Sequence, residues 1–248
     1  MSWRPPLSFE EWFKQKFLPP RWVLRYHIRE EFRRGEAELR LVPFLAHSKR
    51  VSIDIGANKG VWTEVLRPYS SKVVAFEPNP KLFDVLSSGL GAGVEAHPVA
   101  LSYQEGEGAL LVPRGRRGYS NQGASLNPAR VAGREYRALN VPTRRLDDVI
   151  TDDVGFMKVD VEGHELAVLR GGASLIRRCR PNLIVEIEEV HTGRRMEDML
   201  AEVCDMGYHC FALRDGCLTP LEFIDLEASH RNPAHRRDYI FNWIFLPK

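Results

Sequence analysis

A glycine-rich loop directly after a short β-branched run is the first segment suited to ligand binding. It reads DIGANKG over residues 54–60. Gly56 and Gly60 allow a tight turn and a close approach of the backbone to a ligand, and Gly60 leaves the N-terminus of the following helix open. The spacing differs from the dinucleotide motif G-x-G-x-x-G, and no G-K-[ST] follows. Asp54 would repel a pyrophosphate and would suit a cationic ligand.

A second acid follows at the end of the next predicted strand. Glu77 lies in FEPNP, 23 residues after Asp54. An acid at this place can accept hydrogen bonds from both ribose hydroxyls of an adenosine, although an ordinary strand-end carboxylate is the structural alternative. We assign Asn58 and Asn79, from the two turns, to the same site. S-adenosylmethionine, with its sulfonium, amino group and ribose, satisfies both motifs.

A third cluster, KVDVEGHE at residues 158–165, gathers acids and a histidine at another strand end. Such a concentration of charge is costly unless it serves a ligand. We therefore predict Asp160, Glu162 and His164 as catalytic residues. In the structural alternative, Glu165 caps the following helix and His164 is solvated.

Strands alternate with helices from residue 51 onward, and many of the strands are continuously apolar. This pattern predicts an α/β fold in which helices cover both faces of a parallel sheet, with the ligand at the carboxyl ends of the strands. Residues 8–46 have helical apolar spacing, so we divide the chain into a helical cap at 1–49 and a main domain at 50–248. A turn-rich, Arg-rich insertion covers about 104–140. The predicted strands are 51–56, 72–78, 94–101, 155–163, 182–188, 208–213 and 239–247, and the predicted helices are 60–69, 80–89, 164–172 and 195–206.

Six segments in this order resemble the FkbM family of class I S-adenosylmethionine-dependent methyltransferases. They are IDIGANKG, FEPNP, ALS, TRRLDD, KVDVEGHELAVLRGG and RPNLIVEIE, over about 50–190. The resemblance implies a Rossmann-like seven-stranded sheet with an antiparallel last strand, and O-methylation, commonly of sugar or polyketide hydroxyls. It places Asp54, Gly56, Asn58 and Gly60 at the methionine part of the cofactor, Glu77 at the ribose and Asp160 near the transferred methyl. His164 departs from the family pattern, which more often has a small residue there.

An alcohol acceptor needs a base within hydrogen-bond reach, because the protonated hydroxyl is a poor nucleophile. Asp160, Glu162 and His164 are the candidates, and His191 is a weaker one. A metal-assisted alternative would use Asp160 and Glu162 with Glu186 and Glu188 as oxygen ligands for Mg²⁺. We expect no metal, with these acids flanking the substrate cleft instead.

The net charge of +2 conceals an uneven distribution. Residues 108–146 contain a single acid, Glu135, and eight arginines, which form either a solvated loop or a surface for an anionic acceptor. Without a nucleic-acid motif, we expect a small-molecule or glycan acceptor and no nucleic acid. The arginines are Arg114, Arg116, Arg117, Arg130, Arg134, Arg137, Arg144 and Arg145.

The remaining features of the sequence concern the cellular compartment, membrane contact, the cysteines and the alternative functions. No apolar run approaches the ~20 residues of a bilayer span, and no signal peptide is evident, so we expect a cytoplasmic protein. Contact of the aromatic and basic N-terminal segment with a membrane surface stays open. The spacing of Cys179, Cys204, Cys210 and Cys217 matches no zinc site and predicts buried, reduced thiols. The alternative functions are a nicotinamide-dependent oxidoreductase and a non-catalytic binding module on the same fold.

Overall fold

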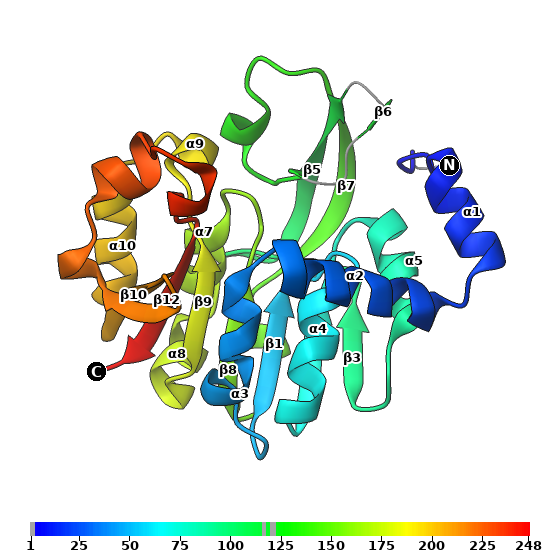
Figure 1. The fold of residues 1–248 in the computed structure, drawn as a ribbon. Coiled ribbons are helices and arrows are strands. Elements are labelled where there is room, and N and C mark those ends of the chain that lie inside the picture. The colour runs from blue at the N-terminus through cyan, green and yellow to red at the C-terminus, as the bar shows by residue number, and fades with distance from the viewer. Residues whose placement is uncertain (1–2, 116–117, 120–122) are drawn as a thin grey trace.

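A large twisted sheet forms the centre of the computed structural model, which describes residues 3–115, 118–119 and 123–248 (Figure 1). The strand order 3-2-1-8-9-12-10 gives the seven strands that the sequence predicts, and β11 adds an eighth at the edge. Strands β3 to β9 in this order are parallel, whereas β12 is antiparallel to both neighbours. The strands are β1 (Val51–Ile55), β2 (Lys72–Phe76), β3 (Val94–His97), β8 (Val154–Val159), β9 (Asn182–Glu186), β10 (Tyr208–Arg214), β11 (Cys217–Pro220) and β12 (Asn242–Pro247).

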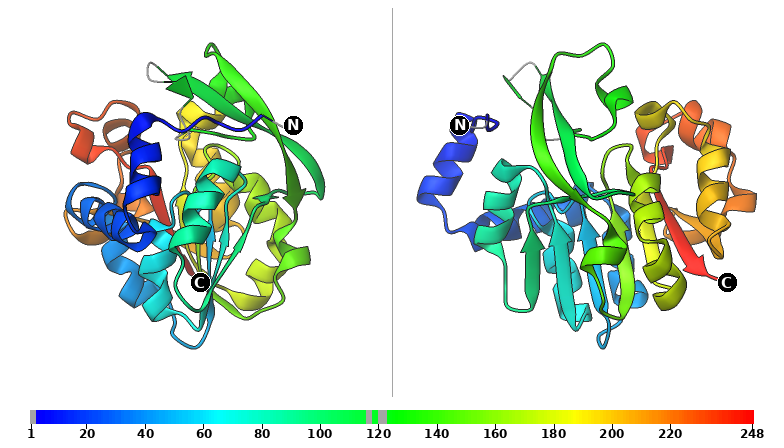
Figure 2. Two further views of the ribbon diagram at one scale, coloured as in Figure 1. Left: turned by 90° about the vertical axis from the view of Figure 1, so that its right-hand side faces the viewer. Right: turned by 180° about the vertical axis from the view of Figure 1, so that it is seen from behind.

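Helices cover both faces of this sheet (Figures 1 and 2). Alternate strand residues point to opposite sides. Ile53 is therefore buried in a core with helices α7, α8 and α10, whereas Phe156 packs with Trp62 of α4 on the other side. The helices are α1 (Phe9–Phe17), α2 (Pro20–Arg34), α3 (Val42–Leu45), α4 (Val61–Leu66), α5 (Pro80–Gly89), α6 (Leu146–Val149), α7 (Glu165–Gly171), α8 (Ala173–Cys179), α9 (Glu189–Thr192) and α10 (Met196–Cys204).

The predicted ends of helices and strands agree best with the structure where a proline or a capping residue sets them. Helix α5 begins at Pro80, and the side chain of Asn79 accepts a hydrogen bond from the backbone of Lys81 at 3.1 Å. The strand predicted over 94–101 is wrong in its length. It is divided, with Pro98 between β3 and β4 (Ala100–Leu101), because proline has no N–H for a strand ladder.

The Arg-rich insertion was expected to be turn-rich, which holds for residues 123–135 but not for its two long strands. Strands β5 (Gly106–Gly115) and β7 (Tyr136–Arg144) pair along their length and form a second sheet with β4 and β6 (Gly118–Tyr119). Leu110, Leu139 and Val141 are buried together, which gives this ribbon its own small core. The ribbon rises beyond the carboxyl ends of the main strands (Figure 2).

The N-terminal segment does not form a separate core. Leu39, Val42 and Leu45 are buried together with strand residues of the main sheet. No helix among the described residues combines the length and apolar character needed to cross a bilayer.

All four cysteines are free, as predicted, but they are not all buried. Cys179 and Cys210 are buried, Cys204 is half-buried and Cys217 is exposed. Cys217 lies on β11, the edge strand that the sequence analysis missed. Its missed signal is the Asp215-Gly216 turn before it, where both residues have positive φ.

Candidate active site

The carboxyl ends of β1, β2 and β8 open into a cavity of about 1010 Å³. Parallel pairing brings these ends to one edge of the sheet, so motifs about 100 residues apart in the chain lie together. Six of the nine predicted site residues line the cavity, namely Gly56, Asn58, Glu77, Asp160, Glu162 and His164.

The other three predicted residues, Asp54, Gly60 and Asn79, are not among the lining residues. Asp54 is 1% exposed and accepts a 2.5 Å hydrogen bond from the Thr63 hydroxyl, which joins β1 to α4. Burial raises the pKa of Asp54 to about 6. Gly60 begins α4 with a φ of 87°, and Asn79 caps α5. These contacts shape the loops beneath the cavity.

Glu77 holds the two loops of the first and second motifs together. One carboxylate oxygen accepts a hydrogen bond from the backbone N–H of Asn58 at 2.8 Å, and the other accepts one from that of Asn79 at 2.8 Å. Burial raises the pKa of Glu77 to about 7, although both hydrogen bonds act in the opposite direction. Its ionisation is therefore sensitive to pH near neutrality.

Gly56 lies against the strand end that carries the third motif. A Cβ atom at this position would lie 1.8 Å from the backbone oxygen of Asp160. The φ of Gly56 is 82°, which also disfavours a side chain. Only glycine therefore permits the first loop to approach Asp160 this closely.

A buried lysine accompanies Asp160. The Lys158 side chain is 1% exposed, and its Nζ lies 3.6 Å from Asp160 and 3.4 Å from Glu36 and donates to Asn242 at 2.8 Å. Burial raises the pKa of Asp160 to about 6, and the attraction of Lys158 opposes that rise. Asp160 is therefore mainly ionised at neutral pH. Lys158 and Glu36 were not predicted as site residues, because their contacts join distant parts of the chain.

Glu162 is held by the second sheet. It has a φ of 57°, and its two carboxylate oxygens accept hydrogen bonds from the backbone of Gly123 and from Arg130 Nε, both at 3.0 Å. Among the insertion's arginines in the described residues, Arg130 is the one that pairs with a predicted site residue. With both oxygens engaged, Glu162 is better suited to position this turn than to exchange a proton.

His164 and Glu165 have different surroundings. The Nε2 of His164 lies 2.9 Å from the Ser102 hydroxyl, and burial lowers the pKa of His164. The carboxylate of Glu165 is buried and accepts hydrogen bonds from the backbone N–H groups of Gly163 at 2.8 Å and Val161 at 3.3 Å. Glu165 therefore holds the turn that precedes α7 and does not cap the helix, which begins without a side-chain cap among the described residues. His164 lines the cavity and is not simply solvated.

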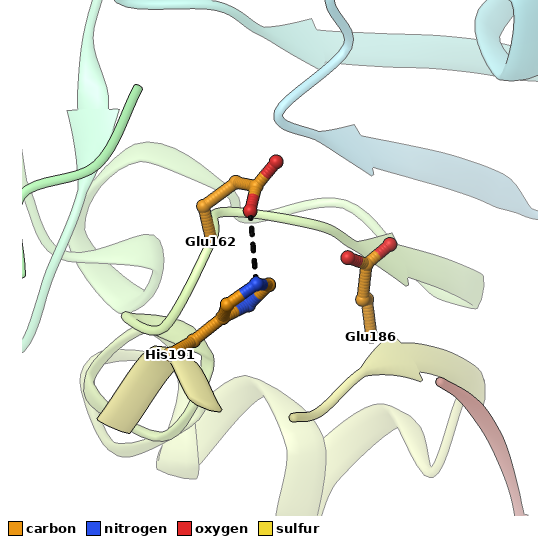
Figure 3. Close-up of side chains that lie close together, drawn as sticks. All are labelled: Glu162, Glu186 and His191. Carbon is orange, nitrogen blue, oxygen red and sulfur yellow. Dashed lines mark ion pairs between the residues drawn. The ribbon is translucent and has the colours of Figure 1, made fainter. Parts of the chain in front are cut away.

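Two residues that line the cavity form a group with metal-ligand character together with His191 (Figure 3). Glu162, Glu186 and His191 each offer a ligand atom, and these atoms lie within 4.8 Å of one another. The His191 side chain is 4% exposed, its Nδ1 has no hydrogen-bond partner among the described residues, and burial lowers its pKa to about 4. Glu186 lines the cavity and has a raised pKa, mainly because of burial. Glu188, expected beside Glu186, lies beyond the end of β9 and accepts a hydrogen bond from Tyr239.

The insertion's arginines are mostly engaged with nearby acids or aromatic rings. Arg114 pairs with Glu135 at 2.7 Å, Arg144 pairs with Glu105, and the Arg137 guanidinium lies 5.0 Å from the centre of the Trp3 ring. Arg116 and Arg117 lie outside the described residues. In the described part of the chain, the arginines that line the cavity lie outside the insertion, and they are Arg34, Arg236 and Arg237.

The amino-acid sequence of this chain is similar to those of known methyltransferases. The model of the methyltransferase FkbM domain matches residues 54–210, which span all three motifs. The chain belongs to the FkbM methyltransferase family. It is 28% identical over 189 residues to methyltransferase sdnD of Sordaria araneosa, covering 63% of this chain and 72% of that protein. It is 31% identical over 141 residues to methyltransferase 1 of Beauveria bassiana, covering 48% of this chain and 57% of that protein.

Among solved structures, the FkbM methyltransferase of Methylobacillus flagellatus is similar at a TM-score of 0.48 and 16% identity. The match covers 79% of this chain and 43% of that one, so this chain spans less than half of that protein.

The family assignment identifies a methyltransferase and favours S-adenosylmethionine over a nicotinamide as its cofactor. The FkbM domain described here also fits that cofactor chemically. Acids at the ends of β2 and β8 face the cavity, where a ribose and a sulfonium would need acceptors and negative charge. Because Gly56 has no side chain, its loop packs against the backbone of Asp160, and the two segments together form one wall of the cavity.

Proposed function

We propose that this FkbM methyltransferase transfers a methyl group to a hydroxyl oxygen of a sugar, glycan or natural-product acceptor. The observation that carries the proposal is Asp160, an acid with a pKa of about 6 on the wall of the cavity. A base with this pKa is ionised at neutral pH and can accept the hydroxyl proton. The family resemblance supports O-methylation of such acceptors.

The residues of the chain divide the work as follows. S-adenosylmethionine supplies the electrophilic methyl group when bound. Gly56, Asn58 and Glu77 bind and orient the cofactor, and Asp160 receives the acceptor's proton. Lys158 keeps Asp160 ionised through its charge. Glu162 positions the turn through Arg130, and His164 contacts the acceptor.

Arg236 and Arg237 line the same cavity and could receive an anionic group of the acceptor. We therefore assign any preference for an anionic acceptor to this C-terminal segment rather than to the insertion. We place the enzyme in the cytoplasm, in keeping with its four free thiols.

The test begins with a methyl-transfer assay over a panel of glycans, natural-product alcohols and acidic lipids, read by mass spectrometry. Calorimetry with S-adenosylmethionine, and with NAD as the comparison, measures cofactor binding separately. Methylation of nitrogen or carbon alone would contradict the O-methylation proposal.

On the acceptor that is found, Asp160→Asn should lower kcat by about 10²–10⁴-fold, the usual contribution of a general base. Thermal unfolding should show a folded protein. Glu162→Gln is the matched control, because it changes an acid two residues away that is already hydrogen-bonded, and it should retain more activity. Turnover of Asp160→Asn at the wild-type rate would refute the role of Asp160.

A further inference from the structure

Helix α1 presents its apolar face to solvent. Phe9, Trp12, Phe13 and Phe17 recur at helical spacing on one side, and their exposed fractions are 80%, 41%, 46% and 56%. Glu11, on the opposite side, faces the protein and pairs with the buried Lys81 at 2.8 Å. This orientation is the reverse of that of an ordinary surface helix, whose apolar side packs on the core.

The four aromatic rings form one continuous surface. The ring centroids of Trp12 and Phe17 are 6.0 Å apart, and those of Phe13 and Phe17 are 4.8 Å apart. Lys16 belongs to the same surface, because its Nζ lies 5.0 Å from the centre of the Trp12 ring. Apolar and cationic groups are therefore interleaved here.

Helix α2 extends this surface. Trp22 and Tyr26 are 67% and 55% exposed, and Lys14 of α1 lies 5.7 Å from the centre of the Tyr26 ring. Four arginines recur at every fourth position beside these aromatic residues, and all four are exposed. They are Arg21, Arg25, Arg29 and Arg33. Within the described part of the chain, only Arg33 among them has an ion pair, with Glu30.

We propose that this aromatic and basic surface, residues 9–29, docks on an anionic phospholipid bilayer. Large exposed apolar patches mark interaction sites. Aromatic rings suit the headgroup region of a bilayer, and unpaired arginines supply the charge complementary to anionic lipids. Helix α1 lies at one side of the molecule, away from the C-terminus, and α2 runs from it across the front of the main sheet (Figure 1).

Docking would bring the cavity near the lipid surface through the same helix. Glu31 and Arg34, in the last turn of α2, line the cavity, as does the following Gly35. An acceptor held at a membrane would then be within reach of the site without any spanning helix.

Vesicle co-sedimentation of the full chain tests the proposal. Vesicles of phosphatidylcholine and phosphatidylserine in equal amounts should bind the protein, and phosphatidylcholine alone should bind it at least tenfold more weakly. Replacing Arg21, Arg25 and Arg29 together by Gln should weaken binding roughly 100-fold, given the usual contribution of each cationic residue. High salt should have the same effect.

The combined variant Trp12→Ala, Phe13→Ala and Phe17→Ala should also lose binding. Phe44→Ala and Phe223→Ala are matched controls, because these rings are 82% and 69% exposed but lie outside the surface. Thermal unfolding should show that all variants fold. Equal affinity for the two vesicle types, or binding that survives both sets of substitutions, would overturn the proposal. So would a dimer, seen by analytical ultracentrifugation, that these substitutions dissociate in a protein that binds no vesicles.

Discussion

The contact between Gly56 and Asp160 provides the sharpest test of how the site is built. In Gly56→Ala, the new Cβ would lie 1.8 Å from the carbonyl oxygen of Asp160 and 2.8 Å from its carbonyl carbon. Both are backbone atoms, so no side-chain rotation can relieve the overlap. The ends of β1 and β8 would have to separate, although the Asp160 N–H donates to the Ile55 oxygen there at 2.9 Å.

The cost has two parts. Alanine at a φ of 82° costs about 1–2 kcal/mol, because left-handed backbone is unfavourable for residues with a Cβ. Relief of the overlap adds about 1–3 kcal/mol, as is typical of overpacked sites. We expect the free energy of unfolding of Gly56→Ala to fall by about 2–5 kcal/mol. We also expect the Kd for S-adenosylmethionine to rise at least about tenfold, which corresponds to ~1.4 kcal/mol.

Gly93→Ala is the matched control. Gly93 has the same φ of 82°, but a Cβ there would meet no atom of the described residues within 4 Å. Its free energy of unfolding should fall by only about 1–2 kcal/mol, and its Kd for S-adenosylmethionine should match wild type. Urea denaturation and calorimetry measure both quantities. If the two variants were equal in stability and in cofactor affinity, the close approach of the two strand ends would not be what forms the site.

Three further predictions concern charge at the site. Because ribose hydroxyls donate to an ionised carboxylate and the pKa of Glu77 is about 7, affinity for S-adenosylmethionine should fall about tenfold as the pH falls from about 8 to about 6. Calorimetry across this range checks the loss, and Glu77→Gln should flatten it. Lys158→Met should reduce the free energy of unfolding by about 3 kcal/mol in urea titrations, because it leaves the half-buried acids Glu36 and Asp160 without their cation. It should also move the acidic limb of the pH–rate profile to higher pH, because the pKa of Asp160 then rises further. An unmoved limb would contradict the role of Lys158 in keeping Asp160 ionised. Dialysis against EDTA should leave turnover unchanged, because Arg130 already occupies the carboxylate of Glu162. A loss of activity that Mg²⁺ restores would instead favour the metal-assisted alternative.

The sequence by itself determined the main sheet and the place of the site. Apolar runs that alternate with helices predict parallel strands, and parallel strands bring their carboxyl ends to one edge. For this reason Gly56, Glu77 and Asp160 could be expected together although they lie in separate motifs. The start of α5 could also be predicted from its proline, because such a local signal acts within one turn of the chain.

Only the tertiary structure decided which side chains meet at that edge. Arg130 reaches Glu162 because the insertion folds as a ribbon over the cavity, and Glu36 reaches Lys158 from the N-terminal segment. Helical periodicity showed that α1 has an apolar face, but periodicity says nothing about what covers a face. The ion pair of Glu11 with Lys81 turns that face outward. Contacts between distant residues depend on the packing of whole elements, which spacing along the chain does not specify.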